Sequence, residues 1–295
     1  MTQGRESGRA IRVDAHQHFW RYSAEEYGWI NDAMRVIRRD FLPVDLLPLL
    51  RETGVDATVA VQTCHSLEET EWLLRLAGEY DWIAGVVGWV SLADREIDVV
   101  LERFASDAKF RGVRHVLQAE PDEYMLRHDF NAGLARLRRY SLVYDALVFE
   151  HQLATAIQLV DRHPEQSFVL DHLAKPRIAA QEFEPWRMRI REMARRPHVD
   201  CKLSGMVTEA DYHAWTLDDM RPYIETVLEA FGPERILFGS DWPVCTVASS
   251  YVRWVSVVDE FVKELSADEQ KAVWGENAAR VYRLQEPVSY EVAQN

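Results

Sequence analysis

The sequence has little of three things, each of which would point to a particular class of protein. Its 295 residues include only three cysteines, Cys64, Cys201 and Cys245, too scattered for a metal-binding motif and too few for a disulfide-stapled domain. No stretch approaches the roughly 18 consecutive apolar residues of a membrane-spanning helix. Basic residues are also scarce, since 34 lysines and arginines against 48 aspartates and glutamates give a net charge of −14. We therefore expect no nucleic-acid partner, which would need a basic surface, and no membrane association.

The composition indicates one large globular domain. Apolar residues make up 47% of the chain, enough for a sizeable core, and no linker, internal repeat or low-complexity segment divides it. We interpret residues 1–295 as one domain with a core over about 11–284. The charged N-terminus has no apolar stretch after it, so the sequence predicts no signal peptide. Together with the scattered cysteines, this predicts a cytoplasmic protein, and a homo-oligomer is not excluded.

Short apolar segments alternate with helical patterns along the chain. Several of these segments are rich in valine, isoleucine and leucine with little alternation, as in strands buried on both faces of a parallel sheet. Helical spacing of apolar residues between them predicts helices over Leu67–Tyr80, Asp129–Tyr140 and Leu217–Phe231. Eight such repeats predict the α/β class and a distorted (β/α)8 TIM-type barrel. The expected strands are Ile11–Ala15, Ala57–Gln62, Ile83–Val90, Gly112–Leu117, Val143–Val148, Phe168–Leu170, Val199–Leu203 and Ile236–Gly239.

Two regions depart from the simple repeat. The segment between the first and second strands is too long for one crossover and is rich in aromatic residues, among them Trp20 and Trp29, so we expect it to form a wall or lid on the catalytic face. After the eighth strand, Tyr251–Leu265 and Ala267–Tyr282 are expected to form terminal helices, the second capped by Ser266.

Polar residues follow the first and last strands, nearly the full chain apart. His16-Gln17-His18 closes the first strand, and Gly239-Ser240-Asp241 closes the eighth. Two histidines at i and i+2 on a strand point to the same side, so they can hold one metal ion or one substrate oxygen. An aspartate from another strand end would complete a site for activating water, with His16, His18 and Asp241 as metal ligands. The structural alternatives are hydrogen-bonded core histidines and an aspartate that caps a turn.

Further candidates lie at other strand ends. His172 follows a strand directly after Asp171, and His151 follows Glu150, although it could simply begin a helix. Arg114 and Lys202 lie within apolar strands, where a cation needs a polar pocket or a buried ion pair. Tryptophans such as Trp20, Trp29 and Trp242 could form apolar parts of a binding site. The remaining histidines are expected to be ordinary surface residues: His65, His128, His163, His198 and His213.

Five motifs, in order, resemble the amidohydrolase superfamily. They resemble most its sugar-lactonase branch, which includes L-fuconolactonase-type and L-rhamnonolactonase-type enzymes, and the resemblance runs from about Ile11 to Leu284. It implies a barrel that hydrolyses the ester bond of an aldonolactone, with His16, His18, His172 and Asp241 as catalytic residues. It further implies substrate contacts from Arg114, His151, Lys202 and Trp242. The motifs are His16-Gln17-His18, Gly112-Val113-Arg114-His115, Leu170-Asp171-His172-Leu173-Ala174-Lys175-Pro176, Cys201-Lys202-Leu203-Ser204-Gly205 and Phe238-Gly239-Ser240-Asp241-Trp242-Pro243.

The sequence departs from the metal-dependent members at two strands. Many of them carry a lysine or glutamate ligand on the fourth strand and a histidine on the fifth, whereas this chain has Val116-Leu117-Gln118 and Tyr144-Asp145-Ala146-Leu147. A two-metal centre is therefore not expected. We expect one loosely held divalent ion, zinc by ligand type, or none, and no organic cofactor.

The sequence thus predicts a lactonase of carbohydrate catabolism whose partner is a small-molecule sugar lactone. Asp241 would activate water to open an L-fucono-lactone-like ring, in its 1,4 or 1,5 form, to the aldonic acid. Two alternatives remain at this stage. One is a metal-dependent decarboxylase of the same superfamily, and the other is a non-catalytic sugar-binding barrel. The stereoisomer, the ring size, the need for metal and the oligomeric state stay open.

Overall fold

The computed structural model describes residues 10–285. Eight strands form one sheet in chain order, every neighbouring pair parallel. The strands are β1 Val13–Gln17, β2 Ala57–Val61, β3 Ile83–Gly88, β4 Phe110–His115, β5 Val143–Ala146, β6 Phe168–Leu170, β7 Val199–Leu203 and β8 Ile236–Phe238. The helices are α1 Pro43–Thr53, α2 Leu67–Glu79, α3 Ile97–Ala105, α4 His128–Leu137, α5 Leu153–Asp161, α6 Trp186–Ala194, α7 Leu217–Phe231, α8 Tyr251–Val262, α9 Ala267–Lys271 and α10 Asn277–Tyr282.

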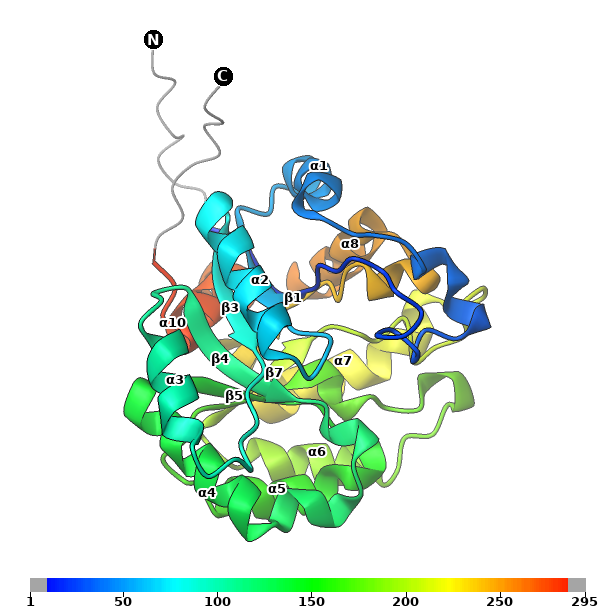
Figure 1. The fold of residues 1–295 in the computed structure, drawn as a ribbon. Helices are drawn as coiled ribbons and strands as arrows, with labels where there is room; N and C mark the ends of the chain where they lie inside the picture. Colours follow the sequence, from blue (N-terminus) through cyan, green and yellow to red (C-terminus); the bar gives the residue numbers. More distant parts are fainter. Residues whose placement is uncertain (1–9, 286–295) are drawn as a thin grey trace.

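The sheet curls into a nearly closed barrel with helices around it (Figure 1). A parallel bridge between Gln17 and Trp242 brings the end of β1 against the segment that follows β8. Almost every strand residue is buried, because side chains fill the barrel on one face and helices cover the other. The predicted (β/α)8 TIM-type fold is confirmed.

The first strand lies two residues further along the chain than predicted, and the reason matters for the site. The sequence predicts Ile11–Ala15, but the strand continues through His16 and Gln17 because the segment after β8 pairs with it. The Asp241 N–H donates to the His16 carbonyl at 2.8 Å, and the His18 N–H donates to the Trp242 carbonyl at 2.7 Å. The strand thus continues through polar residues because the segment after β8 forms hydrogen bonds with their backbone groups.

The fourth strand also differs, running over Phe110–His115 rather than Gly112–Leu117. The chain leaves the sheet after His115 and forms a 3-10 turn over Leu117–Ala119, which places Gln118 beyond the strand end. Strand β5 likewise ends at Ala146, two residues before the predicted Val148.

The terminal helices agree in position with the predictions but differ in form. Ser266 caps the second one, accepting a hydrogen bond from the Glu269 N–H at 3.4 Å. The predicted helix Ala267–Tyr282 consists of α9, a π-helical turn over Ala272–Glu276 and α10. Gly275 in that turn packs so closely that a Cβ would lie 2.1 Å from the Ile11 carbonyl oxygen, a distance only glycine permits.

The long segment after β1 packs into the core at one end and reaches the solvent at the other. Phe19 and Trp20 are fully buried, and the Trp20 indole donates to the Arg39 carbonyl at 2.8 Å. Trp29, by contrast, is 43% exposed. Within residues 10–285, no helix has the length and apolar character needed to cross a membrane.

Candidate active site

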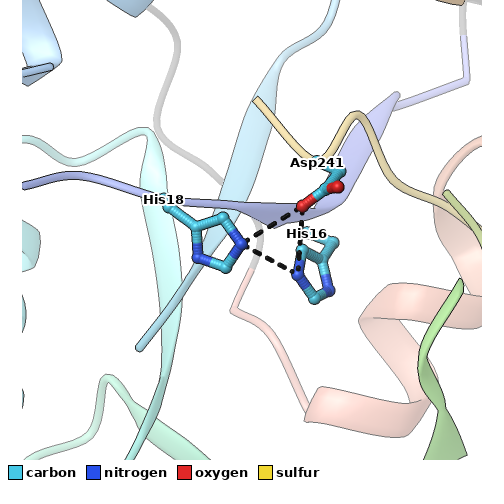
Figure 2. Close-up of side chains that lie close together, drawn as sticks. All are labelled: His16, His18 and Asp241. Carbon is cyan, nitrogen blue, oxygen red and sulfur yellow. Dashed lines mark hydrogen bonds and ion pairs between the residues drawn. The ribbon is translucent and has the colours of Figure 1, made fainter. Parts of the chain in front are cut away.

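Three polar side chains predicted from opposite ends of the chain meet at the C-terminal end of the barrel (Figure 2). The Nε2 atoms of His16 and His18 lie 3.2 Å apart, and the His18 Nε2 lies 3.2 Å from the Asp241 Oδ1. The His16 Nε2 lies 3.8 Å from the same oxygen. The two rings meet because strand alternation places them on one side of β1, as the i, i+2 spacing predicts.

Asp14 holds the two ends of this arrangement together from below. Its carboxylate accepts the Ser240 N–H at 2.8 Å and the His16 N–H at 3.1 Å, so one buried side chain ties β1 to the β8 exit. Asp241 itself has a positive φ of 56°, and its carbonyl accepts the Cys245 N–H at 2.8 Å. The carboxylate is thus fixed by backbone on both sides.

His172 joins the group through an uncommon backbone turn after β6. Four consecutive non-glycine residues, His172 to Lys175, have φ between 50° and 57°. Such left-handed residues cost roughly 1–2 kcal/mol each and concentrate at functional sites. The turn places the His172 Nε2 3.9 Å from the Asp241 Oδ1, while the Nδ1 lies 2.8 Å from the Ser204 Oγ.

Beneath the histidines lies a fully buried ammonium. The Lys202 Nζ lies 2.5 Å from the Asp145 Oδ2 and 3.0 Å from the Asp171 Oδ1, and the lysine has no exposed surface. The Tyr282 hydroxyl donates to Asp145 at 2.9 Å. Two carboxylates therefore compensate this buried cation.

A guanidinium closes the same network from β4. Arg114 NH1 donates to the Asp171 Oδ2 at 3.1 Å, and NH2 donates to the Gln62 carbonyl. Arg114 is only 3% exposed but lines the cavity above the site. Its two partners hold the guanidinium in one orientation, which a planar cation with a fixed donor geometry allows.

The partners of the rings determine which nitrogen carries the proton. Two groups face the His16 Nδ1, the Lys202 Nζ at 3.0 Å and the Asp171 Oδ1 at 3.4 Å. An ammonium only donates, so the nearer Lys202 favours Nδ1 as the acceptor and the proton of a neutral ring on Nε2. Arg114 NH1 also only donates, so its 3.3 Å approach to the His16 Nε2 is not a hydrogen bond in this tautomer. In His18 the order is reversed, because its Nδ1–H donates to the Val61 carbonyl at 2.7 Å and Nε2 keeps its lone pair.

Burial sets the protonation of these groups near neutral pH. It lowers the pKa of His172 to about 4. Burial, and then the Lys202 ammonium, lowers the pKa of His16 well below its usual value. Burial alone would raise the pKa of Asp241, but His172, His18 and His16 together hold it below the usual range of a carboxyl group. The site therefore presents an ionised carboxylate among neutral imidazoles.

A cavity of about 420 Å³ opens above the site. Asp241, His18 and His172 form part of its wall, so all three can meet a bound molecule. Trp29 and Glu26 of the long loop line the cavity as well, which fits the predicted wall. The other lining residues are Thr63, Cys64, His65, Arg114, Val116, Gln118, Ala119, Leu147, Lys175 and Val244.

Not every predicted site residue reaches this cavity. Lys202 lies beneath it and contacts His16, which is also fully buried, and neither residue lines the open space. Trp242 is 2% exposed and packs edge-on against Phe41, with ring centroids 5.3 Å apart. The His151 side chain is 63% exposed and stacks on Phe149, outside the cavity. A 3-10 turn over Glu150–Gln152 directly after the strand carries its ring outward.

Sequence reasoning also missed residues that the structure places at the site. His65, expected to be an ordinary surface residue, is exposed but lines the cavity. Gln118 and Lys175 line it too, and Asp145 is the buried partner of Lys202. The signal available for Gln118 was its position just past a strand end, where polar residues of a barrel face the site.

The histidines and Asp241 fit a single divalent ion. A zinc ion about 2.0–2.1 Å from each ligand would separate tetrahedral ligand atoms by about 3.3 Å. The three distances of 3.2, 3.2 and 3.8 Å among His16, His18 and Asp241 bracket this value. His16, Asp171 and His172 form a second group of potential ligands, but Asp171 is already paired with Arg114 and Lys202.

An eight-stranded parallel barrel with three histidines around an ionised carboxylate at its C-terminal end is the arrangement of an enzyme that activates water. A profile of the amidohydrolase family matches residues 13–284. The chain belongs to the amidohydrolase family.

Its relatives are similar over nearly their whole length. The L-fucono-1,5-lactonase of Burkholderia multivorans is 44% identical over 292 residues, covering 94% of this chain and 98% of that protein. The L-fucono-1,5-lactonase of Burkholderia ambifaria is 36% identical, covering 96% of this chain and 99% of that protein. A crystal structure of an amidohydrolase from Burkholderia multivorans with bound zinc superposes with a TM-score of 0.89 at 44% identity, covering 94% of this chain and all of that one.

Proposed function

We propose that this protein hydrolyses a sugar aldonolactone, L-fucono-lactone-like and in its 1,4 or 1,5 form, to the aldonic acid. The observation that carries the proposal is the Asp241 carboxylate, ionised and cavity-lining, with the nearest nitrogens of three histidines within 3.9 Å of one oxygen. The lactonase relatives at 44% and 36% identity support the substrate class. Neither alternative, the decarboxylase or the sugar-binding barrel, has comparable support.

Asp241 acts as the general base in this proposal. Its carboxylate takes a proton from a water molecule as the water oxygen attacks the lactone carbonyl carbon. The bond between that carbon and the ring oxygen then breaks, and Asp241 returns the proton to the leaving alkoxide. Because the pKa of Asp241 is low, the carboxylate is always available but weakly basic. Stabilisation of the negative charge on the carbonyl oxygen must therefore supply much of the acceleration.

Arg114, which lines the cavity, is the donor best placed to supply it, and the fully buried His16 can act only on an oxygen that enters between its ring and Asp241. The tautomer favoured by Lys202 leaves a proton on the His16 Nε2, beside Asp241, where a hydrogen bond to the developing oxyanion can form. Arg114, held by Asp171 and lining the cavity, adds a fixed positive charge. Both are preorganised by buried partners, so little reorganisation accompanies the reaction. His172 positions Asp241 and the substrate from the opposite strand end.

The proposal also includes one loosely bound divalent ion, which His16, His18 and Asp241 would hold. When bound, such an ion would polarise the carbonyl and acidify water. His18 needs no change of tautomer to bind it, because its Nδ1–H donates to the Val61 carbonyl and its Nε2 carries the lone pair. His16 does, because metal binding requires the Nε2 proton to move to Nδ1, which faces the Lys202 ammonium at 3.0 Å. This conflict is the physical reason to expect weak binding of zinc.

The proposal also covers the domain organisation, the metabolic role and the location of the protein. We treat the chain as one barrel domain of carbohydrate catabolism and keep the cytoplasm as its proposed location. The three cysteines are unpaired, which fits a reducing compartment.

The test is proton release from a panel of five- and six-carbon aldono-1,4- and 1,5-lactones. The 1,4-lactones are the more useful because they open more slowly without enzyme. We expect rapid turnover of a few related stereoisomers and a loss of at least about a hundredfold in Asp241→Asn, the lower end for removing a general base.

The matched control is Asp218→Asn, which neutralises an aspartate whose side chain is 94% exposed on α7. It should keep full activity. If the unmodified protein opens no lactone of the panel, with or without added zinc, the proposed function is wrong. If Asp241→Asn retains the rate, the assigned base is wrong.

A further inference from the structure

The part of the cavity wall that follows β4 takes no part in the mechanism described above. Val116, Gln118 and Ala119 line the cavity there, together with Leu147 from the end of β5. Apart from Gln118, these side chains are apolar, and none of the four is charged. A ligand that meets this wall therefore finds one neutral polar group in an apolar surface, which suits a hydroxyl group better than a carboxylate.

Gln118 has an unsatisfied hydrogen-bonding group at this wall. Its backbone N–H donates to the Leu147 carbonyl at 3.0 Å, which fixes the residue at the mouth of β5. Its side-chain Oε1 is shielded from solvent and accepts no hydrogen bond from any residue between 10 and 285. Buried acceptors are almost always paired, because an unpaired one is costly. Because the Gln118 side chain lines the cavity, a rotation of its amide group brings this oxygen to the wall, where a ligand can supply the missing donor.

A second polar group lines the same cavity and is held in a fixed orientation. The Val116 N–H donates to the His65 Nε2 at 3.0 Å, so the proton of the neutral ring is on Nδ1, and no described residue accepts it. The ring stacks on Trp89 with an interplanar angle of 13° and centroids 5.4 Å apart. The residue keeps an exposed edge, but partial desolvation of the ring, and then His115, lowers the pKa of His65 to about 4, so the ring is neutral at pH 7. The cavity lining thus includes both an acceptor and a donor.

We propose that Gln118 is a specificity-determining residue that accepts a hydrogen bond from a hydroxyl group of the lactone, with the Nδ1–H of His65 as a second polar contact. This inference rests on the proposed function and extends it, because it names the group that distinguishes a hydroxylated sugar lactone from a plain one. A site with a polar group built to receive a hydroxyl rejects an analogue that lacks it, since the polar group is then left unpaired.

The experiment measures kcat and KM of the full chain for the best lactone and for deoxy analogues that lack one hydroxyl each. The variants are Gln118→Leu, which removes the acceptor at similar volume, and Gln118→Met as a more flexible replacement if the leucine variant does not fold. Gln158→Leu, at an exposed position of α5, is the matched control.

For one hydroxyl position, the unmodified protein should prefer the hydroxylated lactone over its deoxy analogue by about ten- to a hundredfold in kcat/KM. Gln118→Leu should bring that ratio near one, mainly by raising KM for the hydroxylated lactone. The other deoxy positions and the control should keep the ratios of the unmodified protein.

The outcomes separate this inference from the proposed function. An active protein whose ratios are the same in Gln118→Leu overturns the role of Gln118 and leaves the lactonase intact. An equal loss of kcat on every substrate also overturns it, since that pattern indicates a structural role. A protein that opens no lactone refutes the proposed function and, with it, this inference.

Discussion

Replacing Lys202 with methionine tests the buried ion network most directly. Methionine keeps the unbranched apolar stem but removes the ammonium. Asp145 then has no cationic partner and Asp171 keeps only Arg114, although neither carboxylate has exposed side-chain surface. Breaking a buried ion pair by removing one partner costs about 3–5 kcal/mol. At about 2–4 °C per kcal/mol for a chain of this size, the melting temperature should fall by roughly 10 °C.

A second substitution separates the charge effect from simple loss of packing. Asp145→Asn removes the nearer unpaired charge, while the Tyr282 hydroxyl can still donate to the amide oxygen. The double variant should therefore be more stable to urea than Lys202→Met alone by about 2 kcal/mol. The free energies of unfolding of all four proteins then give the coupling between Lys202 and Asp145 in a double-mutant cycle. Circular dichroism of all four proteins checks that each starts from a folded state.

The same variants test whether Lys202 acts on catalysis through His16. The double variant should lose kcat with little change in KM, because Lys202 does not line the cavity but fixes the tautomer of the donor. A cost below about 1 kcal/mol for Lys202→Met would refute the reasoning, since that is the scale of an exposed ion pair. A change confined to KM would instead indicate direct contact with the substrate, as the sequence predicts.

Three further predictions concern neighbouring groups. Gly205→Ala places a Cβ 2.5 Å from the ring of His172 at a φ of +63°. The free energy of unfolding should fall by about 1–2 kcal/mol, and kcat should fall by about tenfold or more because the ring is displaced. An unchanged kcat would contradict a role of the His172 ring at this position. Because the pKa of His172 is about 4, kcat/KM should be constant from pH 8 down to about pH 5 and fall near pH 4, where an imidazolium pairs with Asp241 and weakens the base. An inflection near pH 6.5 would refute this. The Lys202→Met/Asp145→Asn protein should bind zinc about tenfold more tightly than the unmodified protein, because the proton of His16 is then free to move to Nδ1. Competition with a chelator measures both affinities. Equal affinities would contradict the assignment of the His16 proton to Nε2.

The barrel and the centre of the site could be predicted because they depend on local patterns. Apolar runs mark strands buried on both faces, and a polar residue directly after such a run lies on the rim where the strand ends meet. This reasoning brings His16, His18, His172 and Asp241 to one rim without any knowledge of distances, and the structure gathers those four side chains. Whether they carry out the proposed chemistry is for the kinetic tests.

What could not be predicted depends on side-chain direction after the strand ends. His151 follows its strand much as His172 does, yet one ring points to solvent and the other to the site. The difference lies in the turns, and nothing in the sequence marks four consecutive left-handed residues when none is glycine. Gln118 was passed over for a similar reason, because an unpaired oxygen is visible only when all its neighbours are placed.

The pairing of β1 with the segment after β8 has a consequence for when the chain can become active. His18 and Asp241 are 223 positions apart in the sequence, yet the His18 Nε2 and the Asp241 Oδ1 lie 3.2 Å apart where β1 meets the segment after β8. During synthesis, a growing chain already carries its first two histidines while the carboxylate they need has not been translated. If Asp241 is the base, as proposed, the chain should be catalytically silent until the segment after its last strand has docked, and a fragment that lacks residue 241 should not turn over substrate. Return of enzymatic rate after dilution from denaturant should then mark the final event of refolding, well after helices have formed.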